Sequence, residues 1–200
     1  LRGRGINQGA YPRKLRLQPA LGCYEKQPGQ KRSKLIASYA AMVACVQGPD
    51  GHAVTLHRTY LKEGRKALGD QSKKLLSAGI NGAAVRLAEA TEEVSLTEGI
   101  ETALAVRLRT GKPTRAAINC GNLERIWIPE RVRRVCIYAD NDADAEFAGQ
   151  ASAYILAQRL VREAKKAGIH RTVEVFVPRQ AGTDWADIWL ASLAKDKRAA

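Results

Sequence analysis

The hydrophobic pattern of the chain changes character near residue 93. Before that point, two β-compatible runs, 36–47 and 53–61, flank the sequence Gly-Pro-Asp-Gly at 48–51. Proline, aspartate and glycine in succession are typical of a tight turn, because each favours one of its backbone conformations. Apolar and polar residues alternate in the second run, as they do in a half-buried strand. This part of the sequence therefore predicts a β-hairpin.

After residue 93, short apolar runs alternate with stretches of helical periodicity. We expect strands at 94–98, 115–119, 134–139 and 172–177, and helices at 100–110, 121–126, 147–167 and 185–194. Gly111 is expected to end the first helix. The apolar stripe of the long helix is read as Phe147, Ala151, Tyr154, Ile155 and Leu160. Strands that alternate with helices predict an α/β fold, with a mostly parallel sheet and helices on both faces.

The first 34 residues carry no such pattern. They contain nine Lys or Arg, one acid and several Gly and Pro, and we expect mostly irregular or short-strand structure there. The sequence thus predicts two parts. Residues 1–92 form a small, basic, mixed α/β lobe that contains the hairpin, and residues 93–200 form the α/β domain with the mostly parallel sheet.

Charge separates the same two parts. The net charge is +13, and residues 1–92 carry 16 Lys or Arg against 6 Asp or Glu, whereas residues 93–200 carry 17 against 14. A basic segment of this kind commonly contacts the phosphates of nucleic acid or of anionic lipid. A solvated, positively charged face is the simpler interpretation, and charge alone does not choose between them.

Cysteine spacing and hydropathy indicate the cellular compartment of the protein. Cys23, Cys45, Cys120 and Cys136 lack the short spacings of zinc or redox motifs, so we expect free thiols in a reducing, cytoplasmic compartment and no structural zinc. No run reaches the length of a membrane span, and nothing at the start resembles a signal peptide. We expect no membrane partner. The Gly/Arg-rich opening at Leu1 is expected to belong to a longer protein.

Carboxylates follow three of the expected strands. Glu98 ends the first of them, Asp140 and Asp142 follow the third, and Asp184 and Asp187 come after the fourth. Ligands of open α/β sheets bind at the carboxyl ends of the strands, so these acids are expected to share one edge. Carboxylates that crowd together repel unless a cation neutralises them, and Mg²⁺ prefers such oxygen ligands.

The same acids have a structural alternative. Asp140, Asp142 and Asp144 precede the long helix, and Glu98 and Asp184 also precede helices. Acids in those positions stabilise a helix N-terminus without any metal. A threefold placement at strand ends favours the functional interpretation.

Two of these segments resemble the Toprim domain family. The family carries an acid in an EG motif after its first strand and a DxD motif after a later strand. Here Glu98-Gly99 lies in LTEGIETALA, and Asp140-Asn141-Asp142 lies in IYADNDADAEFAGQ. Gly149 matches a glycine that commonly follows the DxD motif in primases, and TDWADIWL supplies the acid pair of Asp184 and Asp187. The longer DADAEF spacer departs from the pattern and leaves the role of Asp144 open.

A narrower resemblance covers roughly residues 35–195. LHRTYL, SKKLLSAGINGAAVRL and EGIETALA look like the DnaG-related Toprim primases of phages, plasmids and mobile elements. The resemblance implies RNA primer synthesis on single-stranded DNA from ribonucleoside triphosphates, with Mg²⁺ or Mn²⁺, beside a replicative helicase that is fused or separate. An upstream zinc module usually accompanies these enzymes.

The resemblance also implies residue roles. Asp140 and Asp142 would bind metal directly, Asp184 or Asp187 would complete the set, and Glu98 would be a ligand or the acid–base residue. For template and nucleotide phosphates, the basic part offers Arg58 in the hairpin strand, Lys73 and Lys74 in a glycine-bounded loop, and Arg86. Each of these four could equally belong to a solvated charged face.

Two other classes of function stay open. Another Toprim enzyme, a nuclease or a topoisomerase, would use the same acids, although a topoisomerase needs a nucleophilic tyrosine that none of the six tyrosines clearly provides. A non-catalytic Toprim module that binds DNA or a partner is the third possibility, which the intact acid set disfavours.

Overall fold

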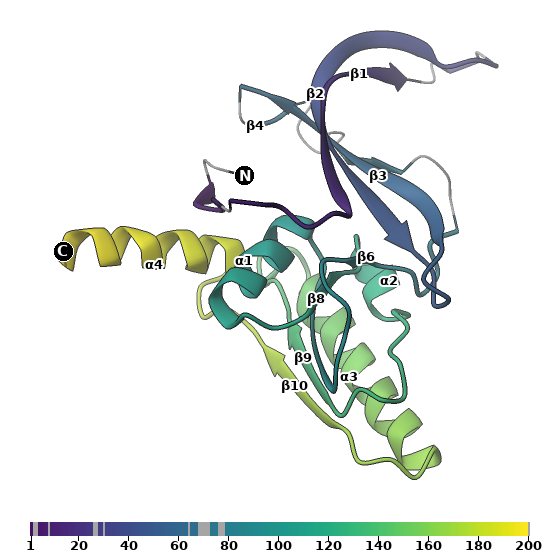
Figure 1. The fold of residues 1–200 in the computed structure, drawn as a ribbon, viewed down its shortest axis with the longest axis vertical. Helices are drawn as coiled ribbons and strands as arrows, with labels where there is room; N and C mark the ends of the chain where they lie inside the picture. The colour runs from purple at the N-terminus through teal and green to yellow at the C-terminus, as the bar shows by residue number, and fades with distance from the viewer. Residues whose placement is uncertain are drawn as a thin grey trace.

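The protein is described by a computed structural model that covers residues 1, 4–7, 9–25, 28–29, 31–63, 65–67, 73–75 and 79–199, with residues 196–199 described by their backbone alone. Two five-stranded sheets lie one above the other, with the helices around the second sheet (Figure 1). Within these residues, no helix combines the length and apolar composition needed to cross a bilayer.

The first sheet is antiparallel. Its strands are β1 (Leu15–Glu25), β2 (Lys34–Gln47), β3 (Ala53–Lys62), β4 (Arg65–Lys66) and β5 (Lys73–Leu75), in the order β1-β2-β3-β4 with β5 also paired to β3. The predicted hairpin is confirmed, since β2 and β3 pair around the turn at 48–51. The described part of this lobe contains strands and no α-helix, so its expected mixed character is replaced by an antiparallel sheet.

Strand β1 shows where the pattern of the first residues was misread. Eleven residues of the segment expected to be irregular or short-stranded form one strand along β2. The register shifts between Gln18 and Leu21 and again between Cys23 and Tyr24, which interrupts the period of two. Pro19 is tolerated because β1 is an edge strand.

The second sheet has the predicted α/β character. Strands β6 (Val85–Arg86), β7 (Glu93–Thr97), β8 (Thr114–Ala116), β9 (Arg134–Tyr138) and β10 (Thr172–Phe176) lie in the order β10-β9-β7-β8-β6. All neighbouring pairs are parallel except β6 with β8. The helices are α1 (Ile100–Thr110), α2 (Cys120–Leu123), α3 (Ala148–Lys166) and α4 (Trp185–Ala199). As expected, Gly111 ends α1 in a left-handed conformation with φ 68°.

Two apolar cores cover the two faces of the second sheet. On one face, β7 and β9 pack against α3 and the segment after α2 through Leu96, Ile137, Leu156 and Leu160. On the other face, α1 shares a core with the first sheet through Leu104, Met42 and Ala44. Backbone hydrogen bonds of 2.9 Å in both directions between Gln47 and Ala84 join the sheets directly. This packing fixes the lobe against the edge of the second sheet.

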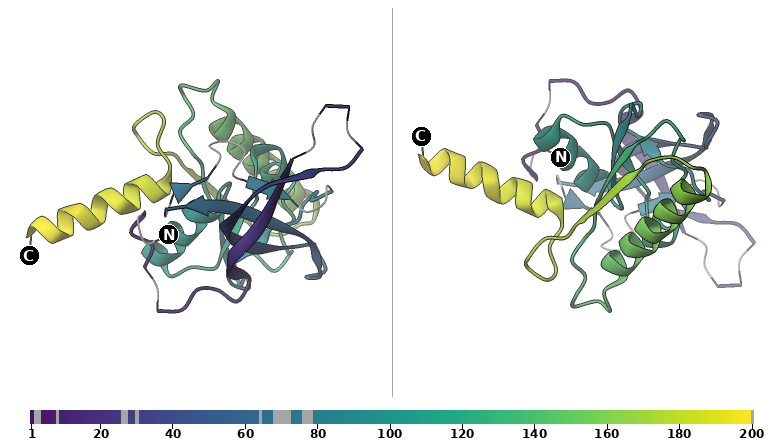
Figure 2. Two further views of the ribbon diagram at one scale, coloured as in Figure 1. Left: turned by 90° about the horizontal axis from the view of Figure 1, so that it is seen from above. Right: turned by 90° about the horizontal axis from the view of Figure 1, so that it is seen from below.

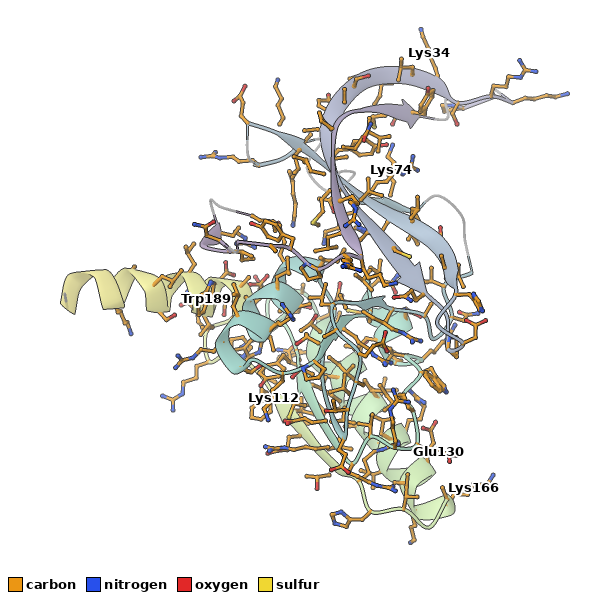
Figure 3. The ribbon with its side chains drawn as sticks, viewed as in Figure 1. Lys34, Lys74, Lys112, Glu130, Lys166 and Trp189 are labelled. Atoms are coloured by element: carbon orange, nitrogen blue, oxygen red, sulfur yellow. The ribbon has the colours of Figure 1, made fainter. Side chains whose placement is uncertain are left out.

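Helix α3 is present as predicted, but only Leu160 of its predicted apolar stripe is buried. Its buried residues include Ser152, Ala153, Leu156 and Leu160, whereas Tyr154 and Ile155 are at least half exposed. Helix α4 begins against α1 and extends away from the body (Figure 2). The indole nitrogen of Trp189 donates to the Gly5 carbonyl at 3.1 Å, which ties the start of the chain to this helix (Figure 3).

Candidate functional site

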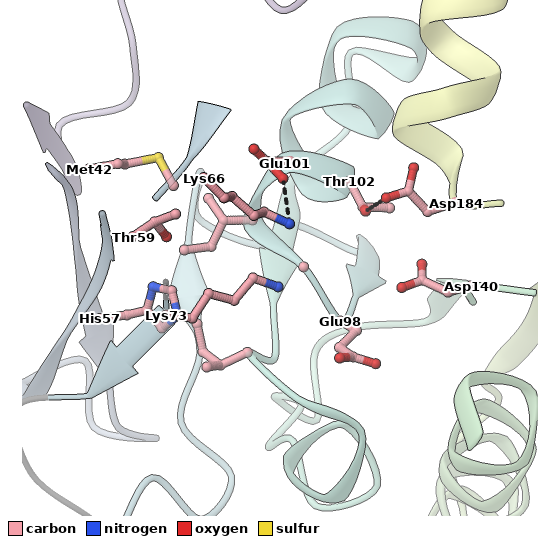
Figure 4. Close-up of a pocket in the computed structure, with 13 residues that line it drawn as sticks. Met42, His57, Thr59, Lys66, Lys73, Glu98, Glu101, Thr102, Asp140 and Asp184 are labelled. Atoms are coloured by element: carbon pink, nitrogen blue, oxygen red, sulfur yellow. Dashed lines mark hydrogen bonds and ion pairs between the residues drawn. The ribbon is translucent and has the colours of Figure 1, made fainter. Parts of the chain in front are cut away.

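Three adjacent strands deliver the acids to one edge of the second sheet. Strands β7, β9 and β10 are neighbours, and each runs in the same direction. Glu98 directly follows β7, Asp140 lies just after β9, and Asp184 precedes α4 after β10. All three line one narrow cavity of about 60 Å³ between the sheets (Figure 4). The structure thus brings together carboxylates from residues more than 80 positions apart.

Asp140 is the most unusual of these groups. Its Oδ1 atom is shielded from solvent and has no hydrogen-bond partner. Burial is the main reason that the pKa of Asp140 rises to about 7, and the carboxylates of Glu98, Asp184 and Asp142 raise it further, against an opposing effect of Lys73. A buried, unpaired oxygen among other acids is costly unless a cation compensates it.

The residues fit a hard divalent cation on these grounds. The donor set is all oxygen, and an orphaned carboxylate oxygen points to a missing positive partner. In the described segments, no three Asp, Glu, His or Cys side chains converge closely enough to enclose an ion. The acids form one wall of an open cleft, which suits Mg²⁺ because that ion usually keeps water and substrate phosphates as ligands.

Asp142 is held by the start of α3. Its Oδ2 accepts a 2.9 Å hydrogen bond from the Gly149 backbone, and its own backbone N–H donates to Gln150 Oε1 at 3.0 Å. A Cβ atom at position 149 would lie 2.7 Å from Asp142 Oδ2 and 2.9 Å from the Asp140 carbonyl oxygen. Glycine at this position therefore permits the close approach of α3 to both acids. The acid of the spacer, Asp144, is exposed and borders a neighbouring shallow pocket with Asp142.

Asp184 and Asp187 stabilise the start of a helix, and Asp184 also faces the cleft. Each carboxylate accepts a hydrogen bond from the other's backbone N–H, at 2.8 and 3.1 Å, and so they cap the N-terminus of α4. Asp184 also accepts from Thr102 at 3.3 Å and faces the cleft. Asp187 is paired with Arg4 at 2.8 Å, and Arg4 lies 3.7 Å from Asp184. No motif marks Arg4, which supplies a cation from the start of the chain.

Glu98 has a partner that no motif in the sequence marks. The Cys120 thiol lies at the start of α2 and donates to Glu98 Oε2 at 2.7 Å. Burial, then this hydrogen bond, raises the pKa of the Cys120 thiol to about 12, so the thiol stays protonated and keeps donating. All four cysteines lie in the described segments and are free thiols, as expected.

The opposite wall of the cleft belongs to the first sheet. Lys73, Lys66, His57 and Thr59 line the cavity and point toward the acids (Figure 4). Lys66 lies 3.5 Å from Glu101, which was also not anticipated. Burial, with the charges of Lys73 and Arg58, lowers the pKa of His57 to about 4, so its imidazole is neutral. A basic wall therefore faces an acidic wall across the cleft.

The two predicted lysines do not act from a loop or from one face. Both lie in β5, where Lys73 pairs with Thr59 and Lys74 pairs with Arg58. Since directly paired residues share a face of a sheet and successive residues alternate, Lys73 faces the acids and Lys74 faces outward with Arg58. The Lys74 ammonium donates to the Tyr24 carbonyl at 3.0 Å, and Arg58 donates to the Leu75 carbonyl at 3.4 Å.

Arg86 lies apart from both walls. Its side chain is buried, its guanidinium donates to the carbonyls of Gly48 and Pro49 in the hairpin turn, and its Cζ lies 5.8 Å from the centre of the Trp127 ring. These contacts fasten the hairpin to the second sheet.

Replacement of Arg86 is therefore expected to act on stability rather than on nucleic-acid affinity. Arg86→Ala should lower the free energy of unfolding by about 1–3 kcal/mol, because two carbonyls lose a charged donor. Urea denaturation measures this loss, and exposed Arg125→Ala is the control that should stay near the parent. A variant with parental stability and weakened DNA binding would contradict this assignment.

Comparison with known proteins places this geometry in a family. A family model for the Toprim domain matches residues 93–195, and the chain belongs to the Toprim domain family. A second model, a domain of unknown function (DUF7146), matches residues 1–87. No curated protein matches the chain. The predicted Toprim fold is thereby confirmed.

Solved structures share the fold across both parts. A DNA primase domain from Pseudomonas aeruginosa is 12% identical with a TM-score of 0.56, covering 88% of this chain and 55% of that one. The primase fragment of the bacteriophage T7 primase-helicase protein is 15% identical with a TM-score of 0.54, covering 80% and 62%. A DnaG primase catalytic domain bound to single-stranded DNA is 11% identical with a TM-score of 0.56, covering 88% and 56%.

These likenesses establish a fold of the DnaG primase type. The chain spans between 55% and 62% of the length of those three solved chains.

Proposed function

We propose that this chain is the catalytic part of a DNA primase, which synthesises RNA primers on single-stranded DNA by metal-dependent nucleotidyl transfer. The observation that carries the proposal is the unpaired, buried Oδ1 of Asp140, set between Glu98 and Asp184 and opposite Lys73. Acids on one wall and a lysine on the other suit a Mg²⁺-bound triphosphate. The fold shared with primase cores supports the same assignment.

Each acid has a proposed part in the reaction. Asp140 and Asp142 would hold Mg²⁺ or Mn²⁺, with Asp184 beside them and Asp187 supporting Asp184 through their shared cap. The metal would lower the pKa of the attacking 3′-hydroxyl and neutralise charge on the leaving pyrophosphate. Glu98, oriented by the Cys120 thiol, would accept the hydroxyl proton. Gly149 keeps Asp142 and the backbone of Asp140 in place.

The basic residues divide between two proposed ligands. Lys73 faces the acids and would hold phosphates of the incoming ribonucleoside triphosphate. Arg58 and Lys74 are paired on the outer face of the first sheet and would contact the single-stranded template. A replicative helicase, fused or separate, is the proposed larger partner.

A single assay separates primer synthesis from the other Toprim activities. Single-stranded DNA, ribonucleotides and Mg²⁺ or Mn²⁺ are incubated with the protein, and the products are resolved on a gel. Synthesis of short RNA is the expected result, and it should be lost in Glu98→Gln and in Asp142→Asn. Cleavage of the DNA would identify a nuclease instead. Binding without any product would indicate a non-catalytic module.

Because Lys73 and Lys74 lie on opposite faces of the sheet, their replacements should affect different ligands, and each variant serves as the control for the other. Lys73→Ala should weaken nucleotide binding about tenfold, because a cation is lost from the triphosphate site. Lys74→Ala should leave nucleotide affinity unchanged and weaken single-stranded DNA binding, with the salt dependence flattened by roughly 0.7 per lost phosphate contact. Fluorescence anisotropy of labelled nucleotide and labelled DNA across a salt series measures both. Identical effects of the two variants on both ligands would contradict this division.

A further inference from the structure

A second cavity opens beside the cleft. It measures about 410 Å³ and is lined mainly by apolar side chains, among them Tyr11, Leu15, Leu17 and Leu61. Leu17 is 68% exposed and Tyr11 is 37% exposed. Several apolar side chains gathered around one exposed cavity form the kind of contiguous patch that marks a binding site. This apolar cavity is distinct from the acidic cleft in its chemistry.

The apolar cavity lies directly beside the acidic cleft. Met42, Thr59 and Glu101 line both of them. Across the first sheet, Leu17 pairs with Met42, Met42 with Thr59, and Thr59 with Lys73, so these four residues form one row on one face. The row runs from the apolar cavity to the lysine that faces the acids. Three strand spacings separate its ends, about 14 Å between the outer Cα atoms.

From this adjacency we infer that the apolar cavity is the nucleoside subsite for the nucleotide whose phosphates occupy the acidic cleft. The inference rests on the proposed function and deepens it. A nucleoside triphosphate needs an anion site for its phosphates and an apolar slot for its base, separated by about the length of the nucleotide. The row from Leu17 to Lys73 has the apolar cavity at one end and the acidic cleft at the other. The base would lie against Tyr11 and Leu17, because aromatic and apolar side chains accept the face of any base.

The junction of the two cavities would hold the ribose. Glu101 and Thr59 provide polar side chains there, and Lys66 lies 3.5 Å from the Glu101 carboxylate and so helps to fix it. A carboxylate is a suitable acceptor for ribose hydroxyls. An apolar peptide segment would match the leucines but would leave this carboxylate and the lysine without a role.

The test compares ATP with inorganic tripolyphosphate, which carries the same phosphates and no nucleoside. Isothermal titration calorimetry with the 200-residue protein and Mg²⁺ should show tighter binding of ATP. Leu17→Ser should weaken ATP binding about tenfold and leave tripolyphosphate unchanged, and Tyr11→Ala should act in the same direction. Leu35→Ser, which replaces a half-exposed leucine of β2 outside the cavity, is the matched control and should bind both ligands like the parent.

Three outcomes would overturn the inference. Equal affinity of the parent for the two ligands would mean that the nucleoside has no subsite. Unchanged ATP affinity in both Leu17→Ser and Tyr11→Ala would place the base elsewhere, and equal loss of both ligands would show a general disturbance. If the parent binds neither ligand, the proposed nucleotidyl transfer fails as well, which separates that failure from the first three results.

Discussion

Asp140→Asn is expected to make the metal-free protein more stable at pH 8 and to slow nucleotidyl transfer strongly. In the folded protein, burial and the neighbouring carboxylates raise the pKa of Asp140 to about 7. Above that pH the folded protein holds a buried charge without a partner. Because the pKa of Asp140 lies roughly three above its usual value, this charge lowers the free energy of unfolding by at most about 4 kcal/mol. Asparagine removes the charge and keeps the shape.

The sign of the pH dependence follows from the raised pKa. Between about pH 4 and pH 7 the folded state keeps a proton on Asp140 that the unfolded chain has released. Stability of the metal-free parent should therefore fall as the pH rises through this window and level off above it. Asp140→Asn should lose this part of the dependence. Mg²⁺ should raise the melting temperature of the parent more at pH 8 than at pH 6, because protons compete with the metal.

Urea denaturation of both proteins at pH 5.5 and pH 8, with and without Mg²⁺, measures the effect. Primer synthesis by Asp140→Asn should fall on the order of 100-fold or more, as expected when charge stabilisation at a reacting phosphate is lost. Glu146→Gln is the matched control, since Glu146 is an exposed acid of the same segment that lines neither the cleft nor the neighbouring pocket and should change neither property. If the stability of Asp140→Asn falls at pH 8, the buried carboxylate is already compensated and the metal assignment is wrong.

The acidic wall of the cleft could be predicted from the sequence, whereas of the basic wall only Lys73 was named, and its facing was not predicted. Glu98, Asp140 and Asp184 could be placed because parallel strands align their carboxyl ends, and the alternating strands and helices were recognisable. Lys66 and Lys73 lie on short strands whose partner is β3, and their facing is decided by pairing register. The pairing register of two strands depends on the tertiary structure and cannot be predicted from the local sequence. For this reason Lys73 and Lys74, which the sequence analysis treated together, lie on opposite faces of the sheet.

Contacts between segments far apart in the sequence could not be predicted for the same reason. Arg4 meets Asp187 across 183 positions, and Cys120 meets Glu98 across 22. Neither residue belongs to a motif that marks it. In α3, the buried face carries small side chains at Gly149, Ser152 and Ala153. The helix approaches the acids closely at Gly149, and this tertiary contact decides which face is buried. The predicted stripe lies mostly on the outer side, where Tyr154 is exposed, and of its members only Leu160 is buried.

Gly149→Ala should destabilise the protein, although alanine is the better helix former. Helix propensity alone favours alanine by up to about 1 kcal/mol. At this position the new Cβ would lie 2.7 Å from Asp142 Oδ2 and 2.9 Å from the backbone oxygen of Asp140, so α3 or the acidic segment has to move. Overpacking of this kind costs about 1–3 kcal/mol.

The shift should also reach the site, because the Gly149 amide holds Asp142 at 2.9 Å. We expect weaker Mg²⁺ binding and slower primer synthesis together with a lower urea midpoint. Gly121→Ala is the matched control, since this glycine also lies in a helix but its nearest atom is 3.8 Å from the added Cβ. That variant should be as stable as the parent or slightly more so. A Gly149→Ala protein with parental stability and parental metal affinity would show that the close approach of α3 to Asp140 and Asp142 is not needed to position the acids.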